Sequence, residues 1–317
     1  MRAIRVHAFG GPGVLQLDEI AQPVAAAGEV LVRITAAGVN PIDLKTRAGG
    51  GVSRAQGPLP FGLGWDLAGD VAALGADVTG FAIGDRVYAM SAFPQLAGCY
   101  AEYAVVRASE LAHAPKTLTA VEAAALPLAA LTAWQALFEA AVLAAGQTLV
   151  VNAAAGGVGH LAVQLAKWRG AQVIGVASAR NVVLLERLGC DRVVDYTQTR
   201  ISSAVQGADV VLDPIGGPER EECFAALRDG GVLVSLVGPA DASAHAARGV
   251  RGTNILVRPD AGQLAEIAAL ADGGQLRPIV EAVLALEDAP RAHELVETGR
   301  TRGKVVLRVR EETNVDG

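Results

Sequence analysis

A glycine-rich segment near the middle of the sequence has the spacing of a phosphate-binding turn. Residues 153–159 read Ala-Ala-Ala-Gly-Gly-Val-Gly, between an apolar stretch that ends at Asn152 and a helical pattern that starts at His160. Glycines let a backbone approach a pyrophosphate, and the amino-terminal end of a helix attracts its charge. We predict a dinucleotide site, and the alternative is a tight turn with no ligand. The residues predicted to hold the phosphates are Gly156, Gly157, Val158 and Gly159.

The residues after the next apolar stretch distinguish the two nicotinamide dinucleotides. An NAD site places an acidic residue at the end of the second strand, where it binds the ribose 2′-hydroxyl. Residues 177–181 read Ala-Ser-Ala-Arg-Asn and contain no carboxylate. Ser178 can donate to a 2′-phosphate, and Arg180 supplies a fixed charge with a forked geometry. The sequence favours NADPH; the alternative is that Arg180 is a solvated residue of a first helical turn.

The cysteines and histidines lack metal-ligand spacing. Cys99, Cys190 and Cys223 are far apart, odd in number and without a CxxC pair, and the five histidines are scattered. A structural zinc site needs about four closely spaced ligands. We therefore expect neither a structural zinc nor a disulfide framework, and a reducing compartment.

The elements that position these residues form two kinds of pattern. Short strands at 29–39, 68–75 and 85–89, separated by frequent glycines, indicate an irregular barrel. From Leu118 strands and helices alternate, with Thr119 as the cap of a helix. These strands are apolar on both faces, which indicates a parallel, doubly wound sheet. The expected strands are 147–152, 171–177, 193–195, 208–213 and 231–238, and the expected helices are 160–169 and 182–188.

The last part of the chain returns to a mixed pattern, with helices at 263–270 and 290–297 and strands at 280–284 and 304–309. We expect a split β domain (residues 1–118 and 256–317) that is interrupted by an α/β nucleotide-binding domain (119–255).

Charge and hydropathy exclude several classes of protein. The net charge is −6 with no Lys/Arg cluster, so nucleic acid is not an expected partner. The longest uncharged apolar stretch, between Glu122 and Glu139, contains Pro127 and falls short of the roughly 20 apolar residues of a bilayer span. The first residues include no signal-like apolar run. We expect a cytoplasmic protein without a membrane partner.

Several further motifs follow one another along the chain. Besides the glycine-rich turn, they are residues 28–33, 37–45, 64–69, 84–87, 126–127, 131–134, 213–217 and 303–307. With these motifs in this order, the chain resembles the zinc-independent branch of the medium-chain dehydrogenase/reductase superfamily, which includes quinone oxidoreductases and zeta-crystallin-like proteins. The resemblance covers nearly the whole chain and implies a GroES-like domain split around a Rossmann domain, with the active site in the cleft between them.

The resemblance also implies further cofactor contacts. Thr132 matches a position near the nicotinamide, although it could be a helix hydroxyl bonded to its own backbone. Tyr196 matches a position by the adenosine phosphate, although it could be a surface tyrosine at a strand end. The loop beside the nicotinamide ring is matched by Leu236, Val237 and Gly238.

The zinc ligands of alcohol dehydrogenase relatives are replaced in this chain. The catalytic cysteine aligns with Asn40 and the histidine with Trp65, so we expect no catalytic zinc. Without a Lewis acid, direct alcohol oxidation becomes harder, whereas conjugate reduction needs only hydrogen-bond donors or a proton for the developing oxygen charge. The resemblance makes Asn40 the best-placed donor, followed by Lys45, with Asp66 near the cofactor. Lys45 could instead be a solvated lysine, and Asp43 is better explained as a helix cap.

These features predict NADPH-dependent reduction of a small hydrophobic quinone or of the C=C bond of an α,β-unsaturated carbonyl. A discrete enoyl-thioester reductase is a close alternative, and Arg47 and Arg54 are candidates for its carrier-binding patch. A non-enzymatic NADPH-binding sensor is an alternative of another class. The resemblance implies a homodimer, and an unpaired strand near residues 231–237 is the candidate interface.

Overall fold

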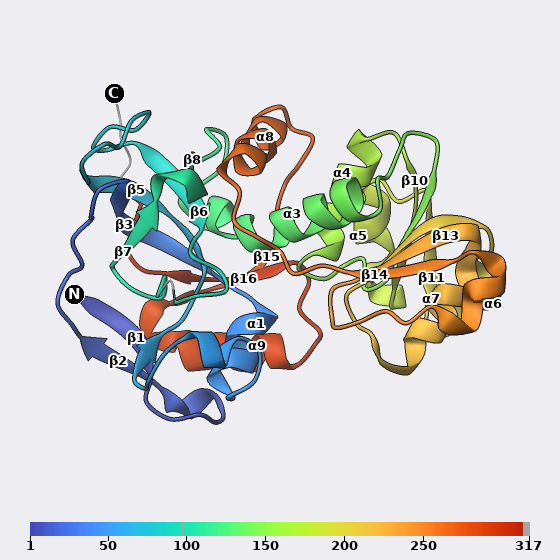
Figure 1. The fold of residues 1–317 in the computed structure, drawn as a ribbon, viewed down its shortest axis with the longest axis horizontal. Helices are drawn as coiled ribbons and strands as arrows, with labels where there is room; N and C mark the ends of the chain where they lie inside the picture. The colour runs from blue at the N-terminus through green and yellow to red at the C-terminus, as the bar shows by residue number, and fades with distance from the viewer. Residues whose placement is uncertain (97, 313–317) are drawn as a thin grey trace. The chain divides into compact units, whose positions relative to one another are not determined.

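The computed structural model describes residues 1–96 and 98–312, which fold into two compact units (Figure 1). One unit comprises Met1–Leu131 and the described residues from Arg258 onward, and the other comprises Thr132–Val257. The sequence pattern changes at Leu118, whereas the packing changes at Leu131, because helix α2 (Ala120–Ala124) contacts strands of the first unit. As predicted, Thr119 caps this helix by accepting a hydrogen bond from the Glu122 N–H.

The first unit is built mainly from antiparallel strands. Its larger sheet has the order β15-β16-β3-β5-β6-β8, with β7 also paired to β3, and only β15 and β16 run parallel. A smaller sheet has the order β2-β1-β4. The strands are β1 (Arg2–Val6), β2 (Leu15–Glu19), β3 (Glu29–Val39), β4 (Phe61–Gly62), β5 (Asp66–Leu74), β6 (Arg86–Met90), β7 (Tyr103–Arg107), β8 (Leu111–His113), β15 (Val280–Ala285) and β16 (Lys304–Arg308).

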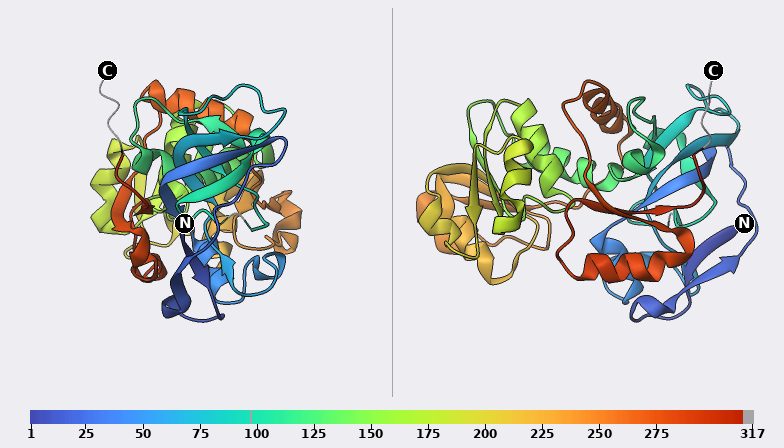
Figure 2. Two further views of the ribbon diagram at one scale, coloured as in Figure 1. Left: turned by 90° about the vertical axis from the view of Figure 1, so that its left-hand side faces the viewer. Right: turned by 180° about the vertical axis from the view of Figure 1, so that it is seen from behind.

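Helices complete this unit. Helix α9, drawn in red-orange, packs against α1 and β16 (Figure 2), and α8 packs against β8. Pro290 lies in the first turn of α9, as the sequence predicts. The helices are α1 (Pro41–Arg47), α2, α8 (Ala261–Asp272) and α9 (Ala289–Glu297).

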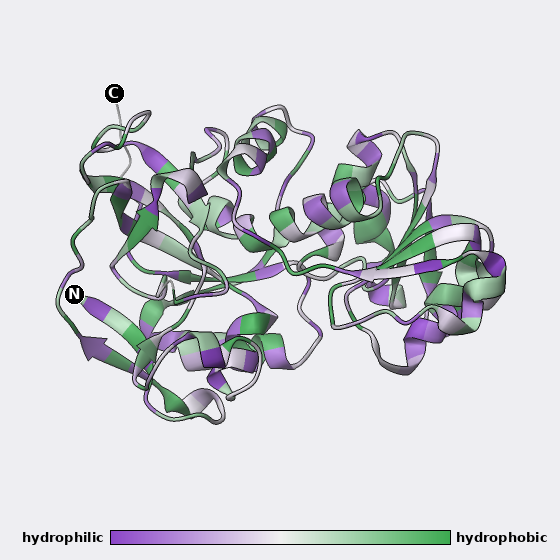
Figure 3. Ribbon diagram, in the orientation of Figure 1, coloured by the Kyte–Doolittle hydropathy of each residue, from purple (hydrophilic) through white to green (hydrophobic). Residues whose placement is uncertain are grey.

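The second unit contains the parallel, doubly wound sheet that the sequence predicts. Its strand order is β11-β10-β9-β12-β13-β14, and every neighbouring pair is parallel. The strands carry hydrophobic segments (Figure 3), and Val150, Val176, Val211 and Leu233 form part of the buried core. The strands are β9 (Thr148–Val151), β10 (Gln172–Ala177), β11 (Arg192–Asp195), β12 (Ala208–Asp213), β13 (Leu227–Ser235) and β14 (Arg251–Asn254), and the helices are α4 (Gly159–Trp168), α5 (Val182–Arg187), α6 (Ile201–Ala204) and α7 (Arg220–Ala226).

The expected unpaired strand at residues 231–237 is wrong. Strand β13 pairs with β12 on one side and with β14 on the other, so the sheet edges among the described residues are β11 and β14. The segment 251–254 reads Arg-Gly-Thr-Asn and has no apolar pattern, which is why the sequence does not indicate a strand there.

No helix in the described part of the chain is long and apolar enough to cross a membrane. The apolar stretch between Glu122 and Glu139 is divided among α2, α3 (Pro127–Trp134) and a wider helical segment, Gln135–Ala140.

Candidate cofactor site and active site

The glycine-rich turn joins β9 to α4, as expected. The Asn152 side chain starts it, because its Oδ1 accepts the Ala153 N–H at 3.0 Å and Ala153 takes a left-handed conformation with φ 51°. The Ala154 N–H then donates to the Val176 carbonyl of β10 at 3.0 Å, which fixes the turn to the neighbouring strand. Helix α4 begins at Gly159, so its first N–H groups face the turn.

Gly159 is required by close packing. A Cβ at this position would lie 2.4 Å from the carbonyl oxygen of Ala153, and at Gly156 it would lie 3.2 Å from the same atom. A side chain at Gly159 would therefore push α4 away from β9, and the amino-terminal end of the helix away from the space a phosphate would occupy.

The ends of β10 and β11 bring two predicted cofactor positions together. Register pairs Ala177 with Asp195, so Ser178 and Tyr196 follow adjacent strands at the same edge, and the Tyr196 N–H donates to the Ala177 carbonyl at 3.3 Å. Tyr196 is 61% exposed and Arg180 is exposed on the turn that precedes α5. The Ser178 hydroxyl accepts from Asn181 Nδ2 at 3.4 Å. This corner presents a hydroxyl, a guanidinium and an aromatic ring.

The remaining predicted cofactor positions also lie in the second unit. Leu236, Val237 and Gly238 follow β13 at the carboxyl edge of the sheet, and the Leu236 N–H donates to the Asp213 carbonyl at 3.0 Å. Thr132 is buried on α3, where the second unit begins.

In the first unit, Asn40 and Asp66 contact each other at the centre of a buried network. Asn40 Nδ2 donates to Asp66 Oδ2 at 2.8 Å, and Asp66 Oδ1 accepts the Leu128 N–H at 2.7 Å. The ammonium of Lys304 donates to Asn40 Oδ1 and to the Val39 carbonyl, and lies 3.5 Å from Asp66 Oδ2. Strand pairing explains the arrangement, because Val305 of β16 lies opposite Val39 of β3.

Burial and charge compete within this network. Asn40, Asp66 and Lys304 are 2%, 0% and 3% exposed. Burial raises the pKa of Asp66, and the Lys304 charge opposes that rise. Burial likewise lowers the pKa of Lys304, and Asp66 opposes that change. The sequence alone assigns no role to Lys304. The signal that could have indicated one is a lysine at the start of an apolar strand, within the segment 303–307.

Lys45 does not join these residues. Its side chain is exposed on α1 and takes no part in the described network around Asn40. Asp43 acts as the expected helix cap, because its Oδ2 accepts the Asn40 N–H at 2.7 Å. Burial raises the pKa of Asp43 to about 7, and the hydrogen bond from Asn40 opposes that rise.

Trp65 has a structural environment. Its ring is fully buried, packs edge-on against Phe93 and donates from Nε1 to the Gln95 carbonyl at 2.7 Å.

The three cysteines are buried and unpaired, and burial raises the pKa of Cys190 and of Cys223 to about 12. Within the described residues, no group of three or more His, Cys, Asp or Glu side chains could hold a metal ion.

Arg47 cannot contribute to a carrier-binding patch as first expected. Its side chain is buried, and its guanidinium binds the Gly10 carbonyl, His293 Nδ1 and the carboxylate of Glu297. Of the two arginines expected in this patch, Arg54 alone is exposed.

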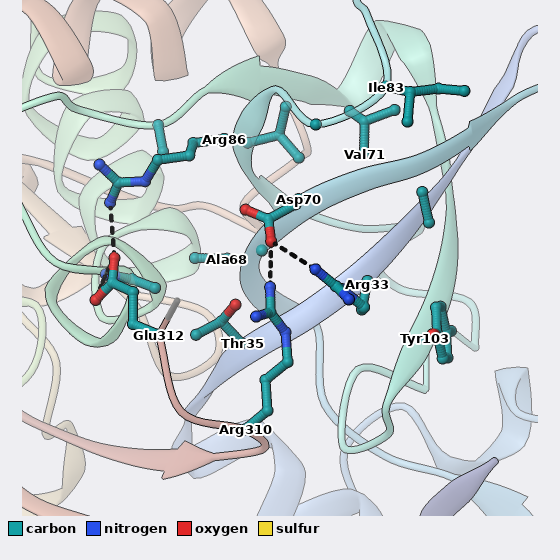
Figure 4. A pocket seen from close by; sticks show the side chains of 16 residues that line it. Arg33, Thr35, Ala68, Asp70, Val71, Ile83, Arg86, Tyr103, Arg310 and Glu312 are labelled. Carbon is teal, nitrogen blue, oxygen red and sulfur yellow. Dashed lines mark hydrogen bonds and ion pairs between the residues drawn. The ribbon is translucent and has the colours of Figure 1, made fainter. Parts of the chain in front are cut away.

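A pocket of about 670 Å³ in the first unit lies apart from these residues (Figure 4). None of the predicted site residues lines it. Asp70 pairs with both Arg33 and Arg310, and Arg86 pairs with Glu312, so the charged groups of the pocket are matched within the protein. This arrangement shows no chemistry of the predicted kind.

Comparison with protein families accords with the two-unit architecture. Residues 26–116 match the alcohol dehydrogenase GroES-like domain, and residues 188–307 match a family described as zinc-binding dehydrogenase. A curated relative, 2-methylene-furan-3-one reductase of Solanum lycopersicum, is 33% identical over 97% of this chain and 79% of its own.

Solved structures agree with this assignment. The quinone oxidoreductase of Coxiella burnetii is 36% identical, with a TM-score of 0.92 over 98% of this chain and 99% of its own. A mycobacterial protein solved as a complex with NADPH is 31% identical, with a TM-score of 0.87 over 98% of this chain and 100% of its own. Both the GroES-like and the Rossmann expectations are confirmed, and the chain belongs to the quinone oxidoreductase-like medium-chain dehydrogenase/reductases, a family of NAD(P)H-dependent oxidoreductases.

Proposed function

We propose that the chain is an NADPH-dependent reductase of small hydrophobic quinones, or of the C=C bond of α,β-unsaturated carbonyls, that works without zinc. The observation that carries the proposal is the buried Asn40 amide held between Asp66 and Lys304. It provides a fixed hydrogen-bond donor beside a buried cation, which is what a developing oxygen charge needs.

The turn between β9 and α4 fits a nicotinamide dinucleotide. The backbone of Gly156, Gly157 and Val158 and the start of α4 at Gly159 would hold the pyrophosphate, because glycines let the backbone approach a phosphate and the helix start attracts its charge. Ser178 and Arg180 would bind the 2′-phosphate, and residues 177–181 offer no carboxylate to a 2′-hydroxyl. Tyr196, Thr132 and the loop 236–238 are the further proposed contacts. When bound, NADPH supplies a hydride to an electrophilic carbon.

The protein itself supplies orientation and electrostatic stabilisation. Asn40 Nδ2 carries two hydrogens, and Asp66 accepts one of them. We assign the second hydrogen to the substrate oxygen, with the amide held in one orientation because Lys304 occupies Oδ1. The Lys304 ammonium adds a fixed positive potential that strengthens this donor as charge develops. Lys45, which is exposed, is the weaker candidate.

The donor set around Asn40 does not fit a zinc ion. The amide oxygen of Asn40 already accepts from the Lys304 ammonium, and a second cation beside that ammonium would be repelled. At the position of the zinc-ligating histidine, Trp65 donates its only N–H to a backbone carbonyl and has no lone pair to offer. We therefore propose that a hydrogen bond, and not a zinc ion, stabilises the charge that develops on the substrate oxygen during reduction.

The experiment is a turnover screen with NADPH and NADH against quinones and α,β-unsaturated ketones, repeated after chelator treatment. We expect turnover with NADPH, weaker turnover with NADH and no effect of the chelator. Equal or better efficiency with NADH would contradict the cofactor proposal, and chelator-sensitive activity restored by zinc would contradict the metal proposal. Binding of NADPH without turnover across the panel would instead support a sensor.

We also propose a cytoplasmic homodimer. The polar strand β14 is a sheet edge in the described structure, and its unpaired backbone groups can pair with a second copy. Mass measurement in solution tests this proposal, and a monomeric mass at micromolar concentration would refute it.

A further inference from the structure

Asp213 is a fully buried carboxylate at the end of β12 and accepts four hydrogen bonds. Its Oδ1 accepts from the N–H groups of Ile215 and Gly216 at 3.1 and 3.0 Å and from Asn152 Nδ2 at 3.3 Å. Its Oδ2 accepts from Arg220 Nε at 3.0 Å. Asp213 opens the segment 213–217, one of the motifs that carry the family resemblance, and the proposed function gives this segment no role.

Arg220 extends this contact to the next strand of the sheet. Its Nη2 donates to Ser235 Oγ at 2.8 Å and to the Val237 carbonyl at 3.0 Å, and its Nη1 donates to the Pro239 carbonyl at 2.6 Å. The planar fork of the guanidinium allows these bonds to form together. Arg220 therefore holds the backbone on both sides of Gly238, in the loop that follows β13.

The local backbone is shaped to admit this guanidinium. Gly216 has φ 71°, and a Cβ there would lie 2.7 Å from Arg220 Nη2 and 2.8 Å from a methyl group of Val237. Any larger residue would displace either the arginine or the loop. The glycine of the segment 213–217 is thus explained by the position of Arg220.

The third connection leads to the glycine-rich turn. Asn152 Nδ2 donates to Asp213, while its Oδ1 accepts the N–H of Ala153, the residue with a left-handed backbone that starts the turn. Strands β9, β12 and β13 are neighbours in the sheet. The pair of the buried Asp213 and the partly exposed Arg220 therefore connects the backbone that follows each of three adjacent strands at the carboxyl edge, where ligands of such sheets bind.

We propose that Asp213 and Arg220 form a positioning clamp that holds the loop after β13 and the glycine-rich turn in their binding geometry before the dinucleotide arrives. The inference rests on the proposed function, because it takes this edge as the cofactor site. Holding both segments in advance lowers the ordering cost of binding. The clamp acts most directly on residues 236–238, so its loss should affect the nicotinamide half of the cofactor more than the adenosine half.

The same three strands carry a matched pair at their opposite ends. Arg228 Nε donates to Asp209 Oδ1 at 2.6 Å, and Asp209 Oδ2 accepts the Thr148 N–H at 2.8 Å. This pair also joins β9, β12 and β13, but at the amino edge of the sheet. Arg228→Gln therefore controls for the general effect of removing an Arg–Asp contact from this sheet.

The test compares Arg220→Gln, Arg220→Lys and Arg228→Gln with the wild-type chain. The dissociation constants of NADPH and of 2′,5′-ADP, an adenosine-side fragment, are measured by fluorescence titration and calorimetry, and kcat and KM by steady-state turnover. For Arg220→Gln we expect roughly tenfold weaker NADPH binding, lower kcat and little change for 2′,5′-ADP, because the lost bonds hold the loop. Arg220→Lys should recover part of the loss, and Arg228→Gln should bind NADPH as the wild type does.

Two results would overturn the clamp: wild-type NADPH binding by a folded Arg220→Gln chain, or equal weakening of NADPH and 2′,5′-ADP. If Arg220→Gln does not fold, Arg220→Lys is tested in its place, and the weakening of NADPH binding is again compared with that of 2′,5′-ADP binding. Thermal unfolding checks that the variant is folded. Failure of the proposed function looks different, because it shows in the wild-type chain as NADH preference or absent turnover. If the wild-type chain prefers NADH, NADH and 5′-AMP replace NADPH and 2′,5′-ADP as the probes. If turnover is absent, the comparison of dissociation constants still applies. A wild-type chain that binds neither dinucleotide would overturn both proposals.

Discussion

Lys304 and Asp66 form a buried ion pair across the end of strand β3. Lys304 Nζ lies 3.5 Å from Asp66 Oδ2, with side chains 3% and 0% exposed, and the Asn40 amide contacts both. Such a pair costs desolvation energy on each side, so a use other than stability alone explains its presence better. In the proposed function this use is to fix the orientation of Asn40.

Removing one member of this pair should destabilise the fold strongly. Lys304→Met leaves the Asp66 carboxylate buried without its cation, which should lower the free energy of unfolding by about 3–5 kcal/mol. The double variant Asp66→Asn/Lys304→Met should lose less than the two single losses combined, because neither charge is then left alone. Chemical denaturation of the three variants measures this coupling.

The control for that cycle is an exposed pair. Lys167 Nζ lies 2.8 Å from Asp191, closer than in the buried pair, but the side chains are 32% and 47% exposed. Lys167→Met should cost only about 0–1 kcal/mol. An additive double-mutant result at Lys304 and Asp66 would contradict the assigned coupling.

Asn40 and Lys45 make opposite predictions for catalysis. Asn40→Ala removes the proposed donor to the substrate oxygen and should lower kcat by roughly 10²-fold, as loss of one such donor does elsewhere. Lys45→Ala should leave kcat close to the wild-type value, because Lys45 is exposed and apart from the Asn40 network. Steady-state kinetics with a quinone and an enone measure both. A larger effect at Lys45 than at Asn40 would contradict this assignment and make the lysine the group that contacts the substrate oxygen.

The sequence predicts the features of the fold that depend on local patterns. Strand β3 occupies the expected residues 29–39, and the glycine-rich turn lies between a strand and a helix, because apolar runs and glycine spacing are written in adjacent residues. The polar strand β14 has no such pattern and was missed, so β13 was expected to be an edge.

The parts of the site that could not be predicted depend on long-range register. Lys304 meets Asn40 across 264 positions, and the contact follows from the pairing of β16 with β3. Arg47 is buried by partners in α9, 246 and 250 positions away, whereas the sequence alone suggested a surface residue. A single sequence places such residues on their own elements but does not show which distant element packs against them.

Arg180 should determine the choice between the two dinucleotides. Arg180→Ala removes a charge-assisted hydrogen bond to the proposed 2′-phosphate, a loss of about 1.5–3 kcal/mol, so kcat/KM for NADPH should fall roughly 10- to 100-fold. The value for NADH should change little, because NADH has no phosphate there. Arg187→Ala, at the exposed end of α5, is the control and should alter neither value. Parallel losses with NADPH and NADH would show that Arg180 supports the fold of the turn instead.

Asp43 and His293 should each make the free energy of unfolding depend on pH, and the two effects should have opposite signs. Burial raises the pKa of Asp43 to about 7 from 3.8, so between these values the folded chain holds a proton that the unfolded chain releases, and stability falls as pH rises. Burial, together with the Arg47 charge, lowers the pKa of His293 to about 3 from 6.5. The unfolded chain then binds the extra proton, and stability rises with pH over that interval.

The two effects overlap between about pH 4 and 6.5 and should largely cancel in the wild-type chain. Asp43→Asn removes the falling contribution while its side-chain oxygen can still accept the Asn40 N–H. Its free energy of unfolding should therefore rise with pH more steeply than that of the wild type, by up to about 1.4 kcal/mol per pH unit. Denaturant titrations at several pH values measure the slope, with Asp77→Asn, an exposed carboxylate, as the control. If the wild-type and Asp43→Asn slopes coincide, Asp43 is ionised in the folded chain throughout this range. That outcome would contradict the raised pKa of Asp43 and would mean that its buried carboxyl group carries a negative charge.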